Sequence, residues 1–375
     1  IRAGGMTDQD DLLPIGLEDA LPARAAAITR AMRAVLDTMD AHGYDRVRPP
    51  LIEFERSLSG RMQGVATRRM VRFTDPESLR TLALRGDMTV QVGRIAATGL
   101  ADAPRPLRLC YAGEVALVKA DQLDPARQRL QMGAELIGSD AVSAASEAVL
   151  LAIASLEAAG LSDISVDFTL PDLVDVLADG ALPLAADQRE AVRRELDTKD
   201  AGGLAAAGGR DYLPLLYATG PFAEAAEKLK ALDAGGELAS RIEGLQAIAE
   251  RIGSRARITL DPTERHGFEY QSWFGFTIYA AGARNAIGRG GTYTIRGSEE
   301  AATGFSLYAE PLLEALGTAQ EAPRDTLFLP LGHDTAIADR LRAIGWRTIA
   351  AIGEADDPRA LGCSHRLEGG EARPL

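Results

Sequence analysis

Polar and apolar side chains alternate from residue 127 to residue 137, which is typical of a strand with one face on a core. The apolar face would consist of Leu130, Met132, Ala134 and Leu136. The opposite face would present Arg127, Arg129, Gln131, Gly133 and Glu135. Charges of both signs around a glycine leave space for a ligand to approach. A plain solvent-facing strand surface is the alternative.

Two more polar residues, Asp87 and Thr89, follow a strand expected at residues 81–85, where sheet proteins often place ligands. Asp87 is predicted to be the N-cap of a helix that runs to about residue 98. A capping carboxylate can also accept a ligand ammonium group. The strand that precedes the 127–137 segment carries Arg108, Cys110, Ala112 and Glu114 at one parity. If the two strands form a hairpin, we expect this set to join the polar face.

Residues 288–293 are dense in glycine and end in Tyr293. The segment fails the dinucleotide-binding fingerprint because Tyr293 stands at the third glycine position, and it fails the phosphate-loop pattern because no Gly-Lys-Ser/Thr follows. We interpret it as a loop whose backbone approaches a small ligand and which presents Tyr293. A tight turn between strands is the alternative.

The elements that position these residues suggest an α+β fold, a mainly antiparallel sheet flanked by helices. Helical spacing spans about residues 18–42 and ends at Gly43, and the prolines in 44–53 favour an extended segment. Strands and helices are expected, in chain order, at 69–85, 106–115, 127–138, 141–159, 256–260, 274–281 and 302–307. Alanine, leucine and glutamate at helical periodicity predict a helical insertion over about residues 170–253.

The chain is therefore expected to contain one large domain, residues 11–320, and a small one, residues 325–375. The small unit is predicted as a truncated α/β domain, with strand, helix and strand at 326–330, 335–344 and 347–352. The tail after residue 354 is expected to be poorly ordered. Residues 1–10 are interpreted as a disordered terminus or a cloning remnant, with Met6 as the native start.

Composition excludes several classes of protein. The formal net charge of -13 argues against a dedicated nucleic-acid binder, which would carry a basic face. Two distant cysteines and four scattered histidines do not form a metal motif, and both Cys110 and Cys363 are expected to be buried filler. No apolar run is long enough to span a membrane, and the start has no apolar signal core. We expect a cytoplasmic protein without a metal ion or cofactor.

Taken in order, these segments resemble the catalytic domain of histidyl-tRNA synthetase, a class II aminoacyl-tRNA synthetase. Residues 43–53 resemble the first class II motif, the hairpin 107–138 the second, and residues 303–307 the start of the third. Residues 84–89, 131–135, 267–270 and 290–293 are similar to the family's histidine-binding segments. The resemblance covers about residues 11–316.

The resemblance implies a histidine pocket. Asp87 and Glu135 would bind the ammonium group, Thr89 and Gln131 would complete the polar shell, and Arg127 would meet the carboxylate. Tyr270 and Tyr293 would contact the imidazole or its neighbours. Gln271 stands where the family has a second tyrosine, which puts imidazole recognition in doubt.

This sequence departs from the family at positions that the family uses to bind and react ATP. Three arginines that the family uses in adenylation are replaced, by our alignment, by Ala112, His266 and Pro311. Fixed cations stabilise the charge that develops on the phosphorus, and losing one such donor typically slows a reaction by roughly two to three orders of magnitude. We therefore predict that adenylation is lost while the amino-acid side of the pocket is kept.

Within this family, the non-catalytic members that bind histidine are the regulatory subunits of ATP phosphoribosyltransferase. The resemblance then implies a partner, the short-form catalytic subunit, which assembles with this chain into a hetero-octamer. The partner would catalyse the first step of histidine biosynthesis. This chain would activate the partner and transmit its inhibition by L-histidine. The resemblance also implies self-association as a dimer through the first class II motif. A membrane is not expected as a partner because no apolar run is long enough to span one, and tRNA is not expected because the net charge is acidic and only about 50 residues follow Pro323. The alternatives are an active or degenerate synthetase and a synthetase-like RNA-binding module.

Overall fold

The computed structural model describes residues 12–59, 70–118, 125–233, 235–265, 271–317 and 325–375. The chain divides into two compact units, Ile1–Gly317 and Thr318–Leu375, and each is considered by itself. Within the described residues, no helix is long and apolar enough to cross a membrane.

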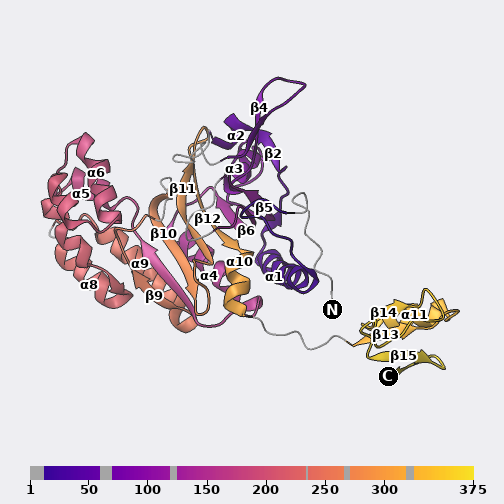
Figure 1. Cartoon of the computed structure of the whole chain (residues 1–375). Helices are drawn as coiled ribbons and strands as arrows, with labels where there is room; N and C mark the ends of the chain where they lie inside the picture. Colours follow the sequence, from indigo (N-terminus) through magenta and orange to yellow (C-terminus); the bar gives the residue numbers. More distant parts are fainter. Residues whose placement is uncertain (1–11, 60–69, 119–124, 234, 266–270, 318–324) are drawn as a thin grey trace. The chain divides into compact units, whose positions relative to one another are not determined.

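The first unit is built on a nine-stranded sheet, counted over the described residues, in the order β1-β5-β6-β12-β11-β10-β7-β9-β8 (Figure 1). Neighbouring strands are antiparallel except for the pairs β1/β5 and β7/β9. The sheet confirms the expected α+β class. Its strands are β1 (Asp45–Arg46), β5 (Leu107–Ala116), β6 (Gln128–Ile137), β7 (Ile164–Thr169), β8 (Gly220–Pro221), β9 (Arg257–Leu260), β10 (Gln271–Ala280), β11 (Gly288–Ile295) and β12 (Glu300–Tyr308).

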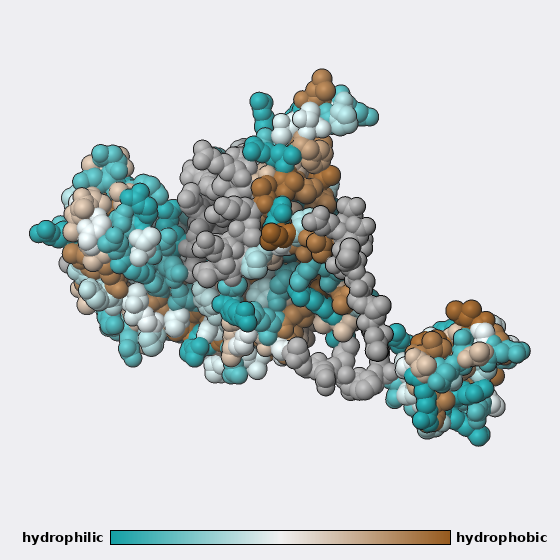
Figure 2. All heavy atoms as spheres, in the orientation of Figure 1, coloured by the Kyte–Doolittle hydropathy of each residue, from teal (hydrophilic) through white to brown (hydrophobic). Residues whose placement is uncertain are grey.

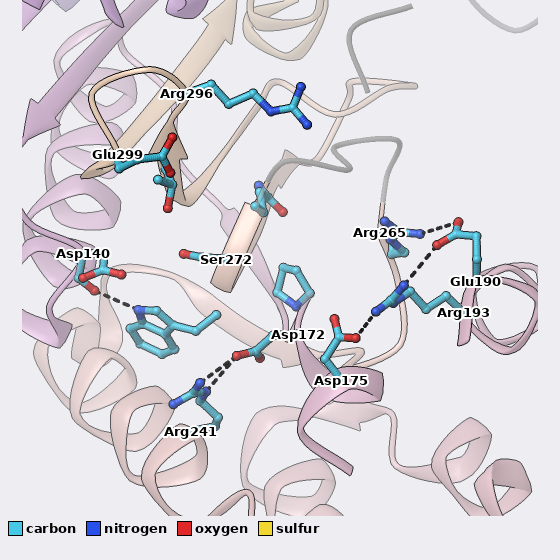
Figure 3. Close-up of a pocket in the computed structure, with 14 residues that line it drawn as sticks. Asp140, Asp172, Asp175, Glu190, Arg193, Arg241, Arg265, Ser272, Arg296 and Glu299 are labelled. Carbon is cyan, nitrogen blue, oxygen red and sulfur yellow. Dashed lines mark hydrogen bonds and ion pairs between the residues drawn. The ribbon is translucent and has the colours of Figure 1, made fainter. Parts of the chain in front are cut away.

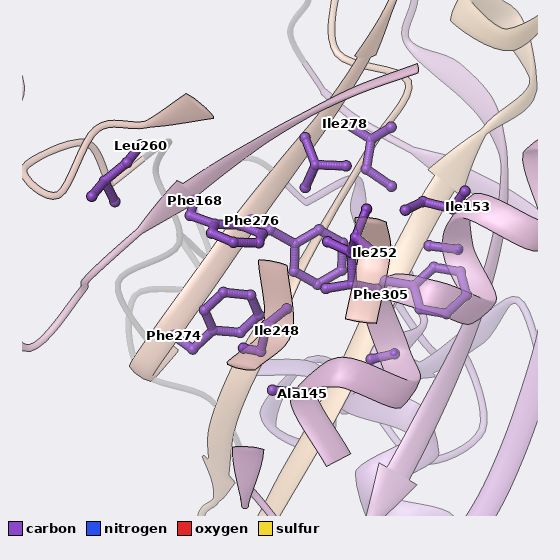
Figure 4. Close-up of a cluster of buried hydrophobic side chains, with 14 of the residues drawn as sticks. Ala145, Ile153, Phe168, Ile248, Ile252, Leu260, Phe274, Phe276, Ile278 and Phe305 are labelled. Carbon is purple, nitrogen blue, oxygen red and sulfur yellow. The ribbon is translucent and has the colours of Figure 1, made fainter. Parts of the chain in front are cut away.

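One face of this sheet carries the main hydrophobic core. Four helices pack over it: α1 (Pro22–Ala41), α4 (Val142–Ala158), α9 (Ala239–Ile252) and α10 (Ala309–Leu316). Their apolar stripes meet a row of aromatic residues on the strands (Figure 4). Phe274 lies 5.4 Å from Phe168 and 5.7 Å from Phe276 between ring centroids. This core fixes the sheet on which the functional side chains lie.

The other face of β5, β6, β11 and β12 packs against α3 (Thr89–Ala97). A small three-stranded sheet in the order β2-β4-β3 lies just before α3 in the chain. Its strands are β2 (Ile52–Phe54), β3 (Arg72–Thr74) and β4 (Thr81–Leu84), and the short helix α2 (Glu55–Ser59) follows β2. The chain leaves β4 through Arg85 and Asp87 and enters α3. The Met88 backbone at the start of α3 donates a hydrogen bond to Gln131 on β6, so this end of the helix lies against the central sheet.

The insertion is helical, as the sequence predicts, apart from the two-residue strand β8. It is drawn in rose at one side of the unit in Figure 1. Its remaining elements are α5 (Leu173–Asp179), α6 (Ala186–Asp197), α7 (Ala201–Ala206), the 3-10 helix η3 (Arg210–Tyr217) and α8 (Phe222–Leu232). Because β7 and β9 flank the insertion and are adjacent parallel strands, its two ends are tied to the sheet.

Three expectations from the sequence were wrong. The glycine-dense segment is not a loop, because residues 288–295 form strand β11. The first helix begins at Pro22, since a residue that precedes proline is disfavoured in a helix and Leu21 has extended dihedral angles. The tail after residue 354 forms two paired strands, β15 (His365–Glu368) and β16 (Glu371–Pro374).

The second unit is a four-stranded sheet in the order β14-β13-β15-β16 with one helix. Strands β13 (Thr326–Leu329) and β14 (Arg347–Ala350) are parallel and are joined through α11 (Thr335–Ala343), as predicted. Asp334 is the N-cap of α11, and its carboxylate accepts hydrogen bonds from the backbone of Ala336 and Ile337. A small core of Leu327, Leu329, Ala338 and Leu367 holds the unit together.

Candidate functional site

A buried carboxylate, Glu135, marks the centre of the pocket on the α3 side of the sheet. Its side chain lies on β6 and the residue is only 1% exposed. The Tyr293 hydroxyl donates a hydrogen bond to Oε2 at 2.8 Å, and the Tyr111 hydroxyl donates to Oε1 at 3.0 Å. Both tyrosines are also buried. The carboxylate is therefore held in a fixed position without a direct route to bulk water.

Gln131 links Glu135's strand to the start of α3. Its Nε2 donates to Asp87 Oδ1 at 2.8 Å and to Ser306 Oγ at 2.7 Å, and its Oε1 accepts from the Met88 backbone at 2.9 Å. Asp87 Oδ1 also accepts from the backbone of Thr89 at 3.0 Å. These contacts join the amide and the aspartate in one hydrogen-bonded network.

The cap of α3 differs from the sequence-based expectation by one residue. The formal N-cap is Met88, whose side chain makes no capping hydrogen bond. Asp87 nevertheless satisfies the Thr89 N–H, the donor that a capping carboxylate usually takes. Asp87 therefore supports the helix end, and its carboxylate also accepts a hydrogen bond from the Gln131 amide.

Burial raises the pKa of the Glu135 carboxyl to about 8. Hydrogen bonds from Tyr293, Thr89 and Tyr111 oppose this shift, and the negative charge of Asp87 adds to it. Burial and the same two carboxylates raise the pKa of Tyr111, which therefore stays a hydroxyl donor. A cationic ligand that replaced the lost solvation of Glu135 would favour the ionised form.

The pocket beside Glu135 is narrow in this structure, with a cavity volume of about 20 Å³. A cavity needs a volume of roughly 10–15 Å³ to hold one buried water molecule, so this cavity has room for about one water. It is lined by Thr89, Glu135, Gln271, Arg289, Tyr293, Ser306 and the backbone around Gly291 and Gly304. An amino acid would have to displace part of the hydrogen-bonded network to enter.

The register of the β5/β6 hairpin corrects one sequence expectation. Ala112 lies opposite Met132 and Cys110 opposite Ala134, so the parity set of Arg108, Cys110, Ala112 and Glu114 shares the apolar side of β6. Arg108 pairs instead with Glu147 on α4, at 2.6 Å. A one-residue change of register exchanges the two faces of a strand, and the sequence does not fix that register.

Tyr111 is one of the residues around Glu135 that the sequence analysis missed. It lies opposite Gly133. A Cβ atom at Gly133 would collide with the Tyr111 hydroxyl, so the Tyr111 side chain can occupy this position only because residue 133 has no side chain. The hydroxyl also lies 3.1 Å from Thr89 Oγ1 and from Ser306 Oγ. A glycine opposite a large side chain is the signal that could have identified it.

Arg127 and Pro311, two other positions singled out in the sequence, are described by the structure. Arg127 precedes β6 and donates from Nε to the Leu117 carbonyl at 3.2 Å, and its backbone N–H donates to the Gly16 carbonyl. Arg127 is not among the residues that line the pocket within the described chain. Pro311 lies in the first turn of α10, where a helix tolerates proline. The expected positions His266 and Tyr270 lie outside the described residues.

Figure 3 shows a second, larger cleft of about 920 Å³. Gln271 lines both this cleft and the pocket beside Glu135. The helical insertion forms one wall, where Arg241 pairs with Asp172 at 2.7 Å and Arg193 with Asp175. The turn between β11 and β12 forms the other wall with Arg296 and Glu299.

The charges in this larger cleft are balanced. Four arginines and five carboxylates line it. Arg193 and Arg265 both pair with Glu190, at 3.1 and 3.2 Å. Because most of these guanidinium groups already meet a carboxylate, the cleft does not offer the concentrated positive charge that a nucleotide triphosphate requires. Among the described residues, no group of His, Cys, Asp or Glu side chains could hold a metal ion.

The sequence and the fold of this chain are similar to those of histidyl-tRNA synthetases. Residues 16–312 match the sequence profile of the family described as Histidyl-tRNA synthetase. The fold is similar to that of the histidyl-tRNA synthetase from Nostoc sp. PCC 7120, with a TM-score of 0.77 at 15% identity over 95% of this chain and 90% of the other. A structure from Bacillus halodurans C, titled an ATP phosphoribosyltransferase regulatory subunit/histidyl-tRNA synthetase, has a TM-score of 0.80 at 24% identity and covers 95% and 97%.

Sequence relatives define the branch within this class. A protein from Rhodospirillum centenum is 40% identical over 97% of this chain and 96% of its own length, and one from Paramagnetospirillum magneticum is 41% identical over 95% and 96%. A third, from Gluconobacter oxydans, is 37% identical over 97% of each chain. All three are described as ATP phosphoribosyltransferase regulatory subunits. The chain belongs to this family of histidyl-tRNA synthetase-like proteins.

Proposed function

We propose that this chain is the non-catalytic subunit that activates a short-form ATP phosphoribosyltransferase and transmits feedback inhibition by L-histidine to it. The observation that carries the proposal is the hydrogen-bonded group of buried Glu135, Gln131 and Tyr293 and half-buried Asp87, on a scaffold shared with histidyl-tRNA synthetase. The catalytic partner, the cytoplasmic location and the assembly into a hetero-octamer follow from the family and are part of the same proposal.

Recognition of an amino acid is supported by the charges in the pocket. Glu135 and Asp87 are both available for an ammonium group, since carboxylates form strong charge-assisted hydrogen bonds with such donors. Thr89 and Gln131 supply neutral polar contacts around them. Tyr293 lies at the edge of the same pocket, where it can pack against an imidazole. We propose all five as histidine-binding residues, with Tyr270 contacting the imidazole as the family resemblance implies.

The absence of adenylation is supported by the positions that the family uses for ATP. Ala112 is apolar and packs on the core side of the sheet, and Pro311 cannot donate a charged hydrogen bond. The test is histidine-dependent exchange of pyrophosphate into ATP by the purified chain. We expect no exchange above background. Exchange at a rate typical of a synthetase would restore the alternative of an active enzyme.

The partner is tested by mixing the chain with a short-form catalytic subunit from the same cell. We expect the two to co-elute in size-exclusion chromatography and the condensation of ATP with phosphoribosyl pyrophosphate to accelerate. Salt-sensitive binding of tRNA in place of the catalytic subunit would favour the RNA-binding alternative. The net charge of -13 argues against that outcome.

Self-association is supported by exposed apolar residues around the first class II motif. Leu51, Ile52 and Phe73 are each more than 40% exposed, and all belong to or border the β2-β4-β3 sheet. Figure 2 shows hydrophobic residues gathered over this part of the unit. Apolar groups in one patch of a surface are typical of an interface. We propose that this surface, named here the β2–β4 surface, forms part of a dimer contact.

A further inference from the structure

An amino-acid pocket needs a cation for the α-carboxylate, and Arg127, to which the family resemblance gave that role, donates its Nε hydrogen bond to the Leu117 carbonyl and is not among the described residues that line the pocket. Arg289 lines the pocket and no other lysine or arginine does so within the described residues. It lies on β11 between two glycines, in the segment that the sequence analysis treated as a loop.

The strand register places Arg289 on the pocket face. Alternate residues of a strand share a face, so Arg289 and Gly291 lie on the same face of β11 as Tyr293. The Tyr293 hydroxyl donates a hydrogen bond to Glu135, which identifies this face as the pocket face. Arg289 lies opposite Ser306 on β12, and Ser306 in turn lies opposite Gly133 on β6. Ser306 is the residue whose hydroxyl contacts Gln131. Arg289 is therefore a cross-strand neighbour of the polar network.

Glycines leave the surface between Glu135 and Arg289 without side chains. Gly304 lies opposite Glu135 on one side and opposite Gly291 on the other. A Cβ atom at Gly304 would collide with Glu135 Oε2, and one at Gly291 would lie 2.8 Å from Gln271 Nε2 and meet the Phe274 carbonyl. The Glu135 carboxyl group and the Arg289 guanidinium thus lie on either side of a stretch of backbone that carries no side chains.

The field of Arg289 extends over the neighbouring strands. Burial raises the pKa values of Tyr308 on β12 and Tyr279 on β10, and the positive charge of Arg289 opposes both shifts. Arg289 is half-buried. A guanidinium in such a position binds a carboxylate more strongly than an exposed one would, because the surrounding protein screens the charge less.

We infer that Arg289 binds the α-carboxylate of the ligand whose ammonium group lies on Glu135, which makes the pocket selective for a free α-amino acid. The inference rests on the proposed function. A guanidinium presents two parallel N–H donors to a carboxylate, and an α-amino acid carries its ammonium and carboxylate groups on the same carbon atom. Amines without a carboxylate, and amino acids whose carboxyl group is blocked, would lose this contact.

The test uses calorimetric titration of the full chain with L-histidine and with histamine, which keeps the imidazole and the ammonium group but lacks the carboxylate. We expect Arg289→Ala to weaken histidine binding by about 10- to 100-fold, the range for losing a hydrogen bond to a charged group. We expect the same variant to leave the weaker affinity for histamine unchanged. Arg289→Lys should recover part of the histidine affinity. Arg296→Ala, an arginine of the larger cleft, is the matched control and should bind histidine as the unmodified chain does.

Equal affinities of the unmodified chain for histidine and histamine would overturn the inference without any variant, so the test does not depend on how Arg289→Ala folds. An Arg289→Ala variant that loses histidine and histamine binding by the same factor would also overturn it. Failure of the unmodified chain to bind histidine at all would contradict the proposed function itself, and the inference would fall with it.

Discussion

At the scale of single residues, we expect Glu135 to link ligand binding to proton release. Its pKa in the folded chain is about 8, so much of it is protonated near neutral pH. An ammonium ligand needs the ionised form. We therefore expect histidine binding at pH ~7 to release close to one proton, measured by titration calorimetry in buffers of different ionisation enthalpy. Glu135→Gln should bind histidine weakly and release no proton. Observed heats that are the same in every buffer would show that Glu135 does not change its charge.

The same carboxyl affects stability with a defined sign. An unfolded glutamate loses its proton near pH ~4.3, whereas Glu135 keeps it to about 8 in the folded chain. Between these values the folded state holds one more proton than the unfolded state, so the free energy of unfolding falls as pH rises. Glu135→Gln should lack this fall in urea unfolding at pH ~5.5 and ~8. Glu243→Gln, at an exposed position, is the control and should keep the slope of the unmodified chain.

The sequence identified the pocket residues that lie in motifs similar to those of the family. It missed the residues whose place in the pocket depends on which strands lie side by side. Gln131 and Glu135 follow from strict alternation in one strand, and the structure brings them together with Asp87, Thr89 and Tyr293. Tyr111 and Arg289 depend on which residues face each other across strands. That pairing is a property of the sheet and is not encoded in the pattern of either strand alone.

At the scale of elements, strand β12 passes so close to β6 that residue 304 must be glycine. We expect Gly304→Ala to lower the free energy of unfolding by about 1–3 kcal/mol, as overpacking usually does, and to weaken histidine binding because the Glu135 carboxylate must move. Chemical denaturation and titration calorimetry measure the two effects. Gly99→Ala is the control, since its nearest neighbour would be the Ile95 carbonyl at 3.9 Å. Identical behaviour of the two variants would refute the close approach.

Helix α11 of the second unit depends on its cap. Asp334→Ala removes two hydrogen bonds to the first turn and should cost about 1 kcal/mol of local stability. Hydrogen exchange of residues 335–343 in the full chain measures this change. Asp339→Ala, which removes an exposed pair with Arg342, should leave exchange almost unchanged. Equal protection in the two variants would argue against the cap.

Strand β11 shows why element prediction failed where the pocket lies. Glycine is depleted in strands, and its density at residues 288–291 indicated a loop. In the structure a Cβ at Gly290 would meet Phe276 and the Gly304 carbonyl, so tertiary packing selects glycine inside a strand. The hairpin and the helical insertion were predictable because their periodicity runs over many residues.

At the scale of the whole molecule, the β2–β4 surface carries a prediction about assembly. A variant with Leu51→Asp and Ile52→Asp should shift a dimer toward monomer in analytical ultracentrifugation, because charges on both partners would have to be desolvated at the contact. Ile352→Asp changes an apolar residue that is 94% exposed in the second unit and serves as the control. A double variant that sediments like the control would place the dimer contact elsewhere.

The most direct measurement of the central claim is inhibition by histidine of the complex reconstituted from this chain and a short-form catalytic subunit. Initial rates are measured against histidine concentration, relative to the rate of each complex without histidine. We predict saturable inhibition with the unmodified chain, and a curve shifted to much higher histidine concentration with Glu135→Gln, since the variant cannot offer a carboxylate to the ammonium group. Equal inhibition with both chains, or none with the unmodified chain, would contradict the account.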